Sequence, residues 1–320
     1  MIRTSIAVLA LCLLTHGCSE TTPRKAVHLR AGIPGIAPRI LAVYEPWFGH
    51  PQHISVGYSS HDPAELHKQI RAAKKMGIYA FVVDWYGDRD PFNAQTYELL
   101  QPIAAQEKFH IAMMYDETDH EDGATDETIA DFMTFRDTYL AQTAAGRDAY
   151  LTDNGRPVIF IFPKGGHTDW NRVREEVSKW NPAPLLIYES IPGPNASAFD
   201  GFYAWVQPGG KGWAADGSNW GEDYLANFYS TMVSKYPDKI TVGGAWAQFD
   251  DSRASWSLNR HIAARCGQTF NDTFSLWRRY FPSDQPMPYL LVETWNDYEE
   301  GTAVEPGIPA CKNETAQQSH

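Results

Sequence analysis

Residues 62–84 read DPAELHKQIRAAKKMGIYAFVVD, and this stretch joins a complete helix to an apolar strand. Asp62 can cap the helix, Pro63 suits its first position, and Glu65 completes a capping box. Gly77 suits the left-handed residue at which a helix ends. The apolar run that follows at once predicts a strand. The stretch therefore predicts one helix–strand unit of an α/β fold.

The same unit recurs along the chain at intervals of about 30 to 40 residues, which is typical of parallel βα units. Eight parallel strands close a barrel. We therefore expect a (β/α)8 TIM-type barrel over residues 38–306, as one domain. The expected strands are Ile40–Tyr44, Ala80–Asp84, His110–Tyr115, Pro157–Phe162, Pro184–Tyr188, Gly201–Val206, Ile240–Trp246 and Tyr289–Thr294.

The expected helices do not complete the pattern at the end of the chain. Few residues follow Thr302, and Pro306 and Pro309 are among them, so the barrel is expected to lack a regular last helix and residues 307–320 to form a tail. The connection from 188 to 201 is also too short for a full helix. Helices after the first are expected at Thr96–Gln106, Glu127–Ala144, Trp170–Trp180, Glu222–Tyr236 and Asn271–Tyr280.

Residues 1–18 have the pattern of an export signal. Arg3 precedes an apolar run, Ile6 to Leu14, that is too short to span a bilayer. Gly17-Cys18-Ser19 resembles a bacterial lipoprotein cleavage site, so lipid anchoring through Cys18 and plain secretion both remain open. The protein is therefore expected to be secreted, periplasmic or lipid-anchored at the cell envelope, with residues 19–37 as a flexible segment.

Charge and cysteine usage narrow the classes of partner. The chain has 39 acidic and 27 basic side chains, a formal charge of -12, and lacks the basic stripe that nucleic-acid binding requires. Cys266 and Cys311 are the two cysteines of the expected folded part, and they form either a disulfide, as an oxidising compartment favours, or two isolated thiols. No Cys or His cluster has zinc spacing, so we expect no metal and no cofactor.

The stretch WNDYEEGT, residues 295–302, places three carboxylates and two aromatic rings at the end of the last strand. Closely packed acids repel when all are ionised, so at least one pKa should rise and leave one proton donor and one acceptor near neutral pH. Glycoside cleavage needs such a pair. The alternative is a solvated acidic turn. Catalysis is expected from Glu300 and Asp297.

Other acidic and aromatic residues follow the expected strands, whose carboxyl ends face a common cup in a barrel. Aromatic rings stack on the faces of a pyranose while acids and amides bind its hydroxyls. A single tryptophan is more often a packing residue, but five fall at strand ends here. The expected substrate-binding residues are Tyr44, Glu45, Trp47, Asp84, Trp85, Tyr86, Asp116, Glu117, Trp205, Trp246, Trp295, Asn296 and Glu299.

Three segments resemble those of glycoside hydrolase families 71 and 99: YEPWFG at 44–49, FVVDWYG at 81–87 and the acidic stretch at 295–302, followed by Val-Glu-Pro at 304–306. The resemblance implies a (β/α)8 barrel that cuts α-1,3-glucan, as family 71 does, or α-mannosides, as family 99 does. It thus implies an exported hydrolase of an α-linked polysaccharide or a mannose-containing glycan. A catalytically inactive glycan-binding protein at the cell surface is the alternative.

The resemblance places the catalytic pair of family 99, two glutamates in Asn-Glu-x-x-Glu-Gly-Thr, on Asp297 and Glu300. The side chain of Asp297 is one methylene shorter than the glutamate of that family. This difference puts in doubt the family 99 route, in which one acid assists attack by the sugar's own 2-hydroxyl. Family 71 shows Trp-Asn-Asp-Tyr-Gly-Glu, which matches both acids but has Gly where Glu299 stands. We expect Glu300 to act as general acid and Asp297 as base, with Glu45 among the acids that bind hydroxyls or replace Asp297.

Neighbours of this pair have less specific expectations. Glu299 is either a solvated charge or a group that raises the pKa of its neighbour, and Glu305 and Asn296 are expected to brace the acidic loop. Histidines in loops can reach the cup, although a loop histidine is more often a surface group. They are His50, His53, His61 and His167.

Overall fold

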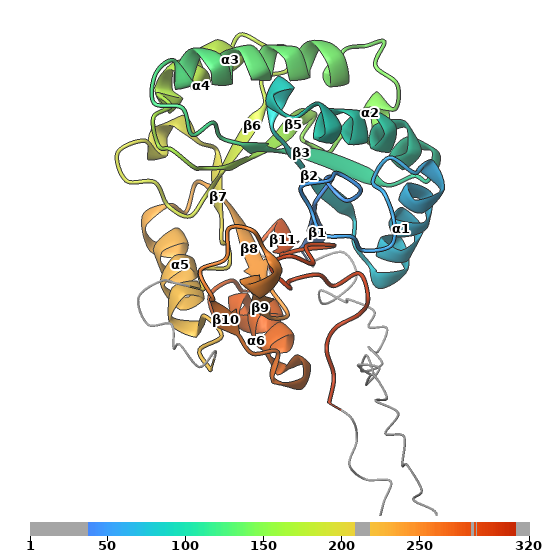
Figure 1. Cartoon of the computed structure of the whole chain (residues 1–320). Coiled ribbons are helices and arrows are strands. Elements are labelled where there is room, and N and C mark those ends of the chain that lie inside the picture. The colour runs from blue at the N-terminus through green and yellow to red at the C-terminus, as the bar shows by residue number, and fades with distance from the viewer. Residues whose placement is uncertain (1–37, 209–217, 283–284, 286, 312–320) are drawn as a thin grey trace, which may run out of the picture.

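The computed structural model describes residues 38–208, 218–282, 285 and 287–311. Eight parallel strands close a barrel in the order β1-β2-β3-β5-β6-β7-β8-β11, with β11 paired to β1 (Figure 1). This confirms the expected fold class. The barrel strands are β1 Arg39–Tyr44, β2 Ala80–Trp85, β3 His110–Asp116, β5 Arg156–Phe162, β6 Leu185–Glu189, β7 Gly201–Tyr203, β8 Ile240–Ala245 and β11 Tyr289–Val292.

Helices surround the barrel in Figure 1 and follow the expected order. Between β6 and β7 there is only the short turn η4, Ala196–Ala198, in place of a helix. The α-helix expected over 127–144 ends at Phe135 and continues as a π-helical turn, η2, Arg136–Leu140. The helices are α1 Pro63–Met76, α2 Pro91–Gln106, α3 Ala124–Phe135, α4 Trp170–Val177, α5 Glu222–Lys235 and α6 Gln268–Leu276.

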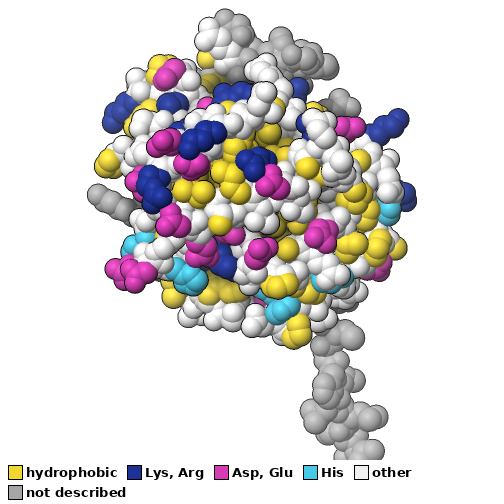
Figure 2. All heavy atoms as spheres, turned by 90° about the horizontal axis from the view of Figure 1, so that it is seen from above, with side chains coloured by type: hydrophobic (Ala, Val, Ile, Leu, Met, Phe, Trp, Pro, Cys, Tyr) yellow, Lys and Arg dark blue, Asp and Glu magenta, His cyan; other side chains and the backbone are white. Residues whose placement is uncertain are grey.

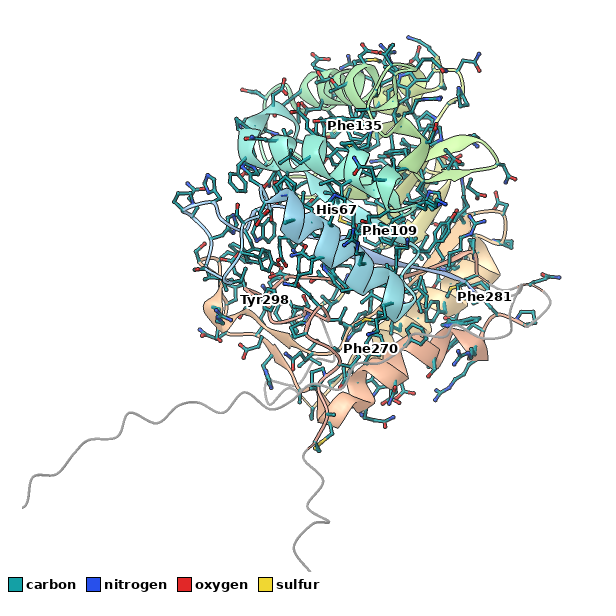
Figure 3. All side chains as sticks on the ribbon, turned by 90° about the vertical axis from the view of Figure 1, so that its right-hand side faces the viewer. His67, Phe109, Phe135, Phe270, Phe281 and Tyr298 are labelled. Carbon is teal, nitrogen blue, oxygen red and sulfur yellow. A yellow bond between two sulfur atoms is a disulfide. The ribbon has the colours of Figure 1, made fainter. Side chains whose placement is uncertain are left out.

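Alternation along the strands divides the core into two layers. Side chains such as Leu41 and Val43 fill the barrel interior, while Ile40, Ala42 and Tyr44 pack outward against the helices. Figure 3 shows how widely this outer layer extends, with Phe135 of α3 in the upper part of the view and Phe270 of α6 in the lower part. The filled interior fixes the strand ends, and these ends position the site.

The end of the described chain packs against α6 without a helix of its own. From β11 to Cys311 no helix is described, and a disulfide joins Cys311 to Cys266, with their Cα atoms 4.7 Å apart. Gly267 has a φ of 89°, and a Cβ there would lie 2.7 Å from the carbonyl oxygen of Pro309. The tail therefore crosses the turn before α6 at van der Waals distance.

Several expectations concern residues outside the described ranges. They are the export signal at 1–18 with Cys18, the segment 19–37, and the last part of the tail, 312–320. Among the described helices, none combines the length and apolarity that crossing a membrane requires. On the face drawn in Figure 2, Lys and Arg side chains are scattered among Asp and Glu rather than gathered in a stripe.

Candidate active site

A cavity of about 490 Å³ opens at the carboxyl ends of the barrel strands. Its wall comes from the ends of β2, β3 and β5, from the segments that follow β1, β2, β5, β7 and β11, and from the loop of a small two-stranded hairpin, β9 Phe249–Asp250 and β10 His261–Ile262. The lining residues are Glu45, Trp47, His53, Asp84, Tyr86, Met114, Asp116, Phe162, Lys164, Trp205, Trp256, Asp297 and Glu300.

A second hollow of about 510 Å³ lies at the other end of β5, between η2 and the turn before that strand. It is lined by Arg136, Arg147, Tyr150 and Trp180 among others, and by none of the residues that the sequence predicted for the site. The cavity at the carboxyl ends is therefore the candidate active site, as barrels of this type lead one to expect.

The period of two along each strand explains which acids enter the cavity. On β2, Ala80 and Val82 point into the barrel, so Asp84 does as well. On β3, Met114 and then Asp116 follow the same line. Glu45 continues the inward side of β1 beyond the last paired residue. Three neighbouring strands thus each deliver one carboxyl group.

Asp297 is buried in a tight turn after β11. Its Oδ1 atom accepts hydrogen bonds of 2.8 Å from the backbone N–H groups of Glu299 and Glu300, and its own N–H donates to Oγ1 of Thr294 at 2.7 Å. Burial raises the pKa of Asp297 well above its usual range, and the charge of Glu300 raises it further. One oxygen of Asp297 is thus fixed by the backbone, and the residue still lines the cavity.

Glu300 lies at the mouth of the same cavity. Its Oε1 atom accepts a hydrogen bond of 3.0 Å from Nε1 of Trp256, and Nη2 of Arg260 is 3.9 Å away. Burial raises the pKa of Glu300, although the Trp256 hydrogen bond and the charge of Arg260 both lower it. The two carboxyl groups therefore both have a raised pKa and influence each other's titration.

The acids from the first three strands form the other half of the cavity. Burial raises the pKa of Glu45, Asp84 and Asp116, to about 6 for Asp84 and about 8 for Asp116. The charge of Asp84 adds to the effect on Glu45 and on Asp116. Lys164 is the one lysine among the lining residues, which include no arginine, and its Nζ is 2.7 Å from Oδ1 of Asp116.

Aromatic rings form the wall near Glu300. The His53 ring stacks on Trp47 with centroids 4.7 Å apart, and the Trp256 ring meets Trp47 edge-on at 6.3 Å. Trp256 is 42% exposed, so part of its side chain is open to solvent at the rim. Across the cavity, Trp205 packs on Phe162 at 5.3 Å. Rings beside acids are the surface that a pyranose needs.

Four of the expected aromatic residues do not line the cavity. Tyr44 and Trp85 fall on the outward side of β1 and β2, where alternation turns them toward the helices. Trp246 and Trp295 come after the last paired residues of their strands and are fully buried in the same outer layer. Their position at a strand end was not sufficient to place them in the cup, because the side of the sheet also matters.

Three expected polar residues support the site without lining it. Asn296 accepts from the N–H of Glu45 at 2.7 Å and donates to its carbonyl oxygen at 2.8 Å. Glu117 accepts from the N–H of Lys164 at 2.9 Å. Glu299 is only 2% exposed and accepts from the N–H of Ile54 at 3.2 Å, so the expectation of a solvated charge is wrong. Its charge is among the causes that raise the pKa of Asp297 and of Glu300.

The acidic loop has a further brace in Glu305, as expected. Its Oε2 atom accepts from the hydroxyl groups of Tyr298 at 2.9 Å and Tyr58 at 3.1 Å. Tyr298 is labelled in the left half of Figure 3. Of the loop histidines, His53 lines the cavity and hydrogen-bonds Glu299 at 2.7 Å. The loop between β1 and α1 is therefore tied to the acidic loop.

Sequence reasoning missed Lys164, Trp256, Met114 and Phe162. Lys164 had a usable signal, because it follows Phe162 by two residues and so shares the inward side of β5. Trp256 had none, since it lies in an irregular segment between β9 and β10. Among the described residues there is no group of three His, Cys, Asp or Glu side chains arranged to hold a metal ion.

Comparison with known proteins supports the fold. No family model and no curated protein matches the chain. Two structures of the GH99 endo-α-mannosidase from Bacteroides thetaiotaomicron, one in complex with bis-tris propane, share 19% identity and a TM-score of 0.61 with it, covering 84% and 83% of this chain and 87% of theirs. A glycoside hydrolase-like protein shares 15% identity and a TM-score of 0.61, over 87% of this chain and 91% of that one. The fold therefore matches that of glycoside hydrolases at low identity.

Proposed function

We propose that this chain is a glycoside hydrolase that cleaves an α-linked polysaccharide or a mannose-containing glycan. The observation that supports this most is that Asp297 and Glu300 line one ring-walled cavity, each with a raised pKa. The matched fold of a GH99 endo-α-mannosidase is consistent with such a substrate, although fold alone does not fix function.

In the proposed reaction Glu300 donates its proton to the glycosidic oxygen as the bond from that oxygen to C1 breaks. Burial raises the pKa of Glu300, which favours the protonated form that a general acid needs, and the Trp256 N–H group orients the carboxyl group. Asp297 accepts a proton from the attacking group as the oxygen of that group forms the new bond to C1. The attacking group is either water, which gives the product directly, or the sugar's own 2-hydroxyl, in which case water then opens the 1,2-anhydro sugar that forms. Glu45, which lines the same cavity, is the alternative base.

A catalytically silent glycan-binding protein is the second candidate. It is favoured by the two hydrogen bonds that Oδ1 of Asp297 accepts from the backbone, because a carboxylate that caps a turn has a structural role without any reaction. In such a protein the rings and acids of the cavity would hold a saccharide without cleaving it.

Turnover by a Glu300→Gln variant tests the proposal. The mature protein is incubated with α-glucans, yeast mannan and aryl α-glycosides, and released reducing ends are measured. We expect hydrolysis of at least one substrate and a loss of at least about 100-fold in the variant, with saccharide binding retained. Glu98→Gln, an exposed change on α2, is the matched control. Binding without release on every substrate would establish the silent protein instead.

We also propose that the protein is exported, either freely secreted or held by a lipid on Cys18. The apolar run at 6–14 supports export, and the Cys266–Cys311 disulfide suits an oxidising compartment. Cell fractionation and the mass of the mature N-terminus test this. A lipid-sized mass increase that a Cys18→Ser variant lacks identifies the anchored form, and an intact N-terminus in the cytoplasmic fraction contradicts export.

A further inference from the structure

The cavity holds more acidic side chains than one acid–base pair needs. Five of the residues that line the cavity are acidic. The cavity lining includes one lysine, Lys164, and it is paired with Asp116. His53 is the other basic ring of the lining, and it is hydrogen-bonded to Glu299. The positive charges of Lys164 and Arg89 also act on Asp84 and lower its pKa, whereas the charged neighbours that shift the pKa of Glu45 are all acids.

Two of these acids have oxygens that lack a partner. Oε2 of Glu45 and Oδ1 of Asp84 are buried, with no hydrogen-bond donor in the described part of the chain. Their residues are 4% and 7% exposed, and both line the cavity. A buried carboxylate oxygen without a donor is costly, so a ligand that brings a donor to this place relieves the cost.

The kind of donor matters because of the charge. A sugar hydroxyl offers one hydrogen bond and leaves the negative charges uncompensated. An ammonium group offers three N–H donors and one positive charge, so a single group can satisfy both oxygens and offset their mutual repulsion. The rings of Trp47 and Trp205 beside the acids favour a cation as well as a pyranose face.

We propose that the site selects a glycan that contains a free amino sugar, with its ammonium group held between Glu45 and Asp84. This inference rests on the proposed function, whose substrate class it specifies. Each acid has the role that its place allows: Asp297 and Glu300 act on the glycosidic bond, while Glu45 and Asp84 recognise the amine. An N-acetyl group in the same place would lose both the charge and two of the three donors.

The test is binding, measured by calorimetry on the Glu300→Gln variant so that no ligand is consumed. The probes are the methyl α-glycosides of glucosamine, galactosamine and mannosamine, their N-acetyl forms, and the corresponding 2-hydroxy sugars. We expect at least one free amine to bind about tenfold more tightly than both of its neutral counterparts, the ratio that one charge-assisted hydrogen bond provides. Added NaCl should reduce this preference, because it screens the ion pair.

Second substitutions in the same background locate the effect. Glu45→Gln and Asp84→Asn should each remove the preference for the amine, and Glu98→Gln, which removes an exposed charge on α2, should keep it. Equal binding of amine and neutral glycosides, or a preference that survives both cavity substitutions, overturns the inference. Amine binding without hydrolysis of any glycan would contradict the proposed function but not this inference. Hydrolysis of neutral glycans without a preference for the amine would contradict this inference but not the proposed function.

Discussion

Nε1 of Trp256 donates a hydrogen bond of 3.0 Å to Oε1 of Glu300, and this contact joins an exposed ring at the rim to the proposed general acid. The donor favours the ionised carboxylate, so it lowers the pKa of Glu300 against the effect of burial. The hairpin of β9 and β10 thus influences the pH at which Glu300 loses its proton.

Replacing Trp256 with Phe should move the basic limb of the kcat/KM profile to higher pH. The ring is kept but the donor is lost, so the pKa of Glu300 rises and the acid stays protonated to a higher pH. A pH profile on an aryl glycoside measures the shift. Leu258→Ala changes the most exposed apolar residue of the same hairpin and is the control, since its hydrogen bond to Asp251 comes from the backbone N–H and survives the change, so the limb should stay in place. If the basic limb does not move in Trp256→Phe, the Trp256 hydrogen bond does not control the pKa of Glu300.

The barrel could be predicted because its signals are local. Asp62 caps α1 through a 2.9 Å hydrogen bond to the N–H of Ala64, and Gly77 ends it at a φ of 100°, as the sequence indicates. The strands are short apolar runs, and all eight appear within a few residues of their expected bounds. The end of α3 was less predictable, because the π-helical turn after Phe135 has no local marker.

The residues of the site could be predicted only where position along a strand decides whether a side chain enters the cavity. Glu45 directly follows β1, and Asp84 and Asp116 lie at the ends of β2 and β3, all on the inward side, so position along the chain was sufficient to find them. Tyr44 and Trp85 are adjacent to those acids in sequence but lie on the opposite side of the sheet. Which side faces inward depends on the packing of the whole barrel, which a single strand does not reveal.

Asp297→Asn separates a catalytic from a structural role of this residue. The amide oxygen can still accept from the N–H groups of Glu299 and Glu300, so the turn and the unfolding temperature should be retained, while loss of the base should reduce kcat by about 100-fold or more. Asp297→Ala should lose both hydrogen bonds and cost about 2 kcal/mol of stability. Full activity in the Asn variant would mean that Asp297 is not the base and that another acid of the cavity accepts the proton.

Asn296→Ala should destabilise the fold by about 2–4 kcal/mol, because it leaves the N–H and C=O of Glu45 buried without partners. Asn296 itself is fully buried. Equilibrium unfolding in urea measures the change. Asn227→Ala, an exposed change on α5, should stay within about 0.5 kcal/mol. Equal midpoints for the two variants would show that water replaces the lost contacts.

Removing the Cys266–Cys311 disulfide should cost about 4 kcal/mol, since it closes a segment of 45 residues and restricts the unfolded chain. A double substitution to Ser, compared with wild type by thermal unfolding, gives the difference. Addition of a reductant should lower the wild-type midpoint toward that of the variant and leave the variant unchanged. A reductant effect of equal size on both proteins would point to some cause other than this disulfide.

The burial of Glu293 predicts how the stability of the fold depends on pH. Its side chain is fully buried, Oε2 accepts from the N–H of Val206, and Oε1 has no partner in the described ranges. Burial raises the pKa of Glu293 well above its usual range, and the charge of Glu189 adds to this. A raised pKa in the folded state means that the fold keeps a proton which the unfolded chain releases. Stability is therefore complete below the ordinary glutamate pKa and falls as pH rises toward the folded value.

Glu293→Gln should remove this part of the decline, which amounts to as much as about 1.4 kcal/mol per pH unit for one group. The variant should thus gain stability relative to wild type as pH rises from 4 toward 7, with urea unfolding as the measurement. Glu98→Gln, exposed on α2, should follow the wild-type slope. Parallel curves for wild type and Glu293→Gln would mean that Glu293 ionises in the folded barrel as freely as in the unfolded chain. The close packing around its side chain argues against that outcome, because a Cβ added at Gly244 would lie 2.6 Å from Oε1 of Glu293.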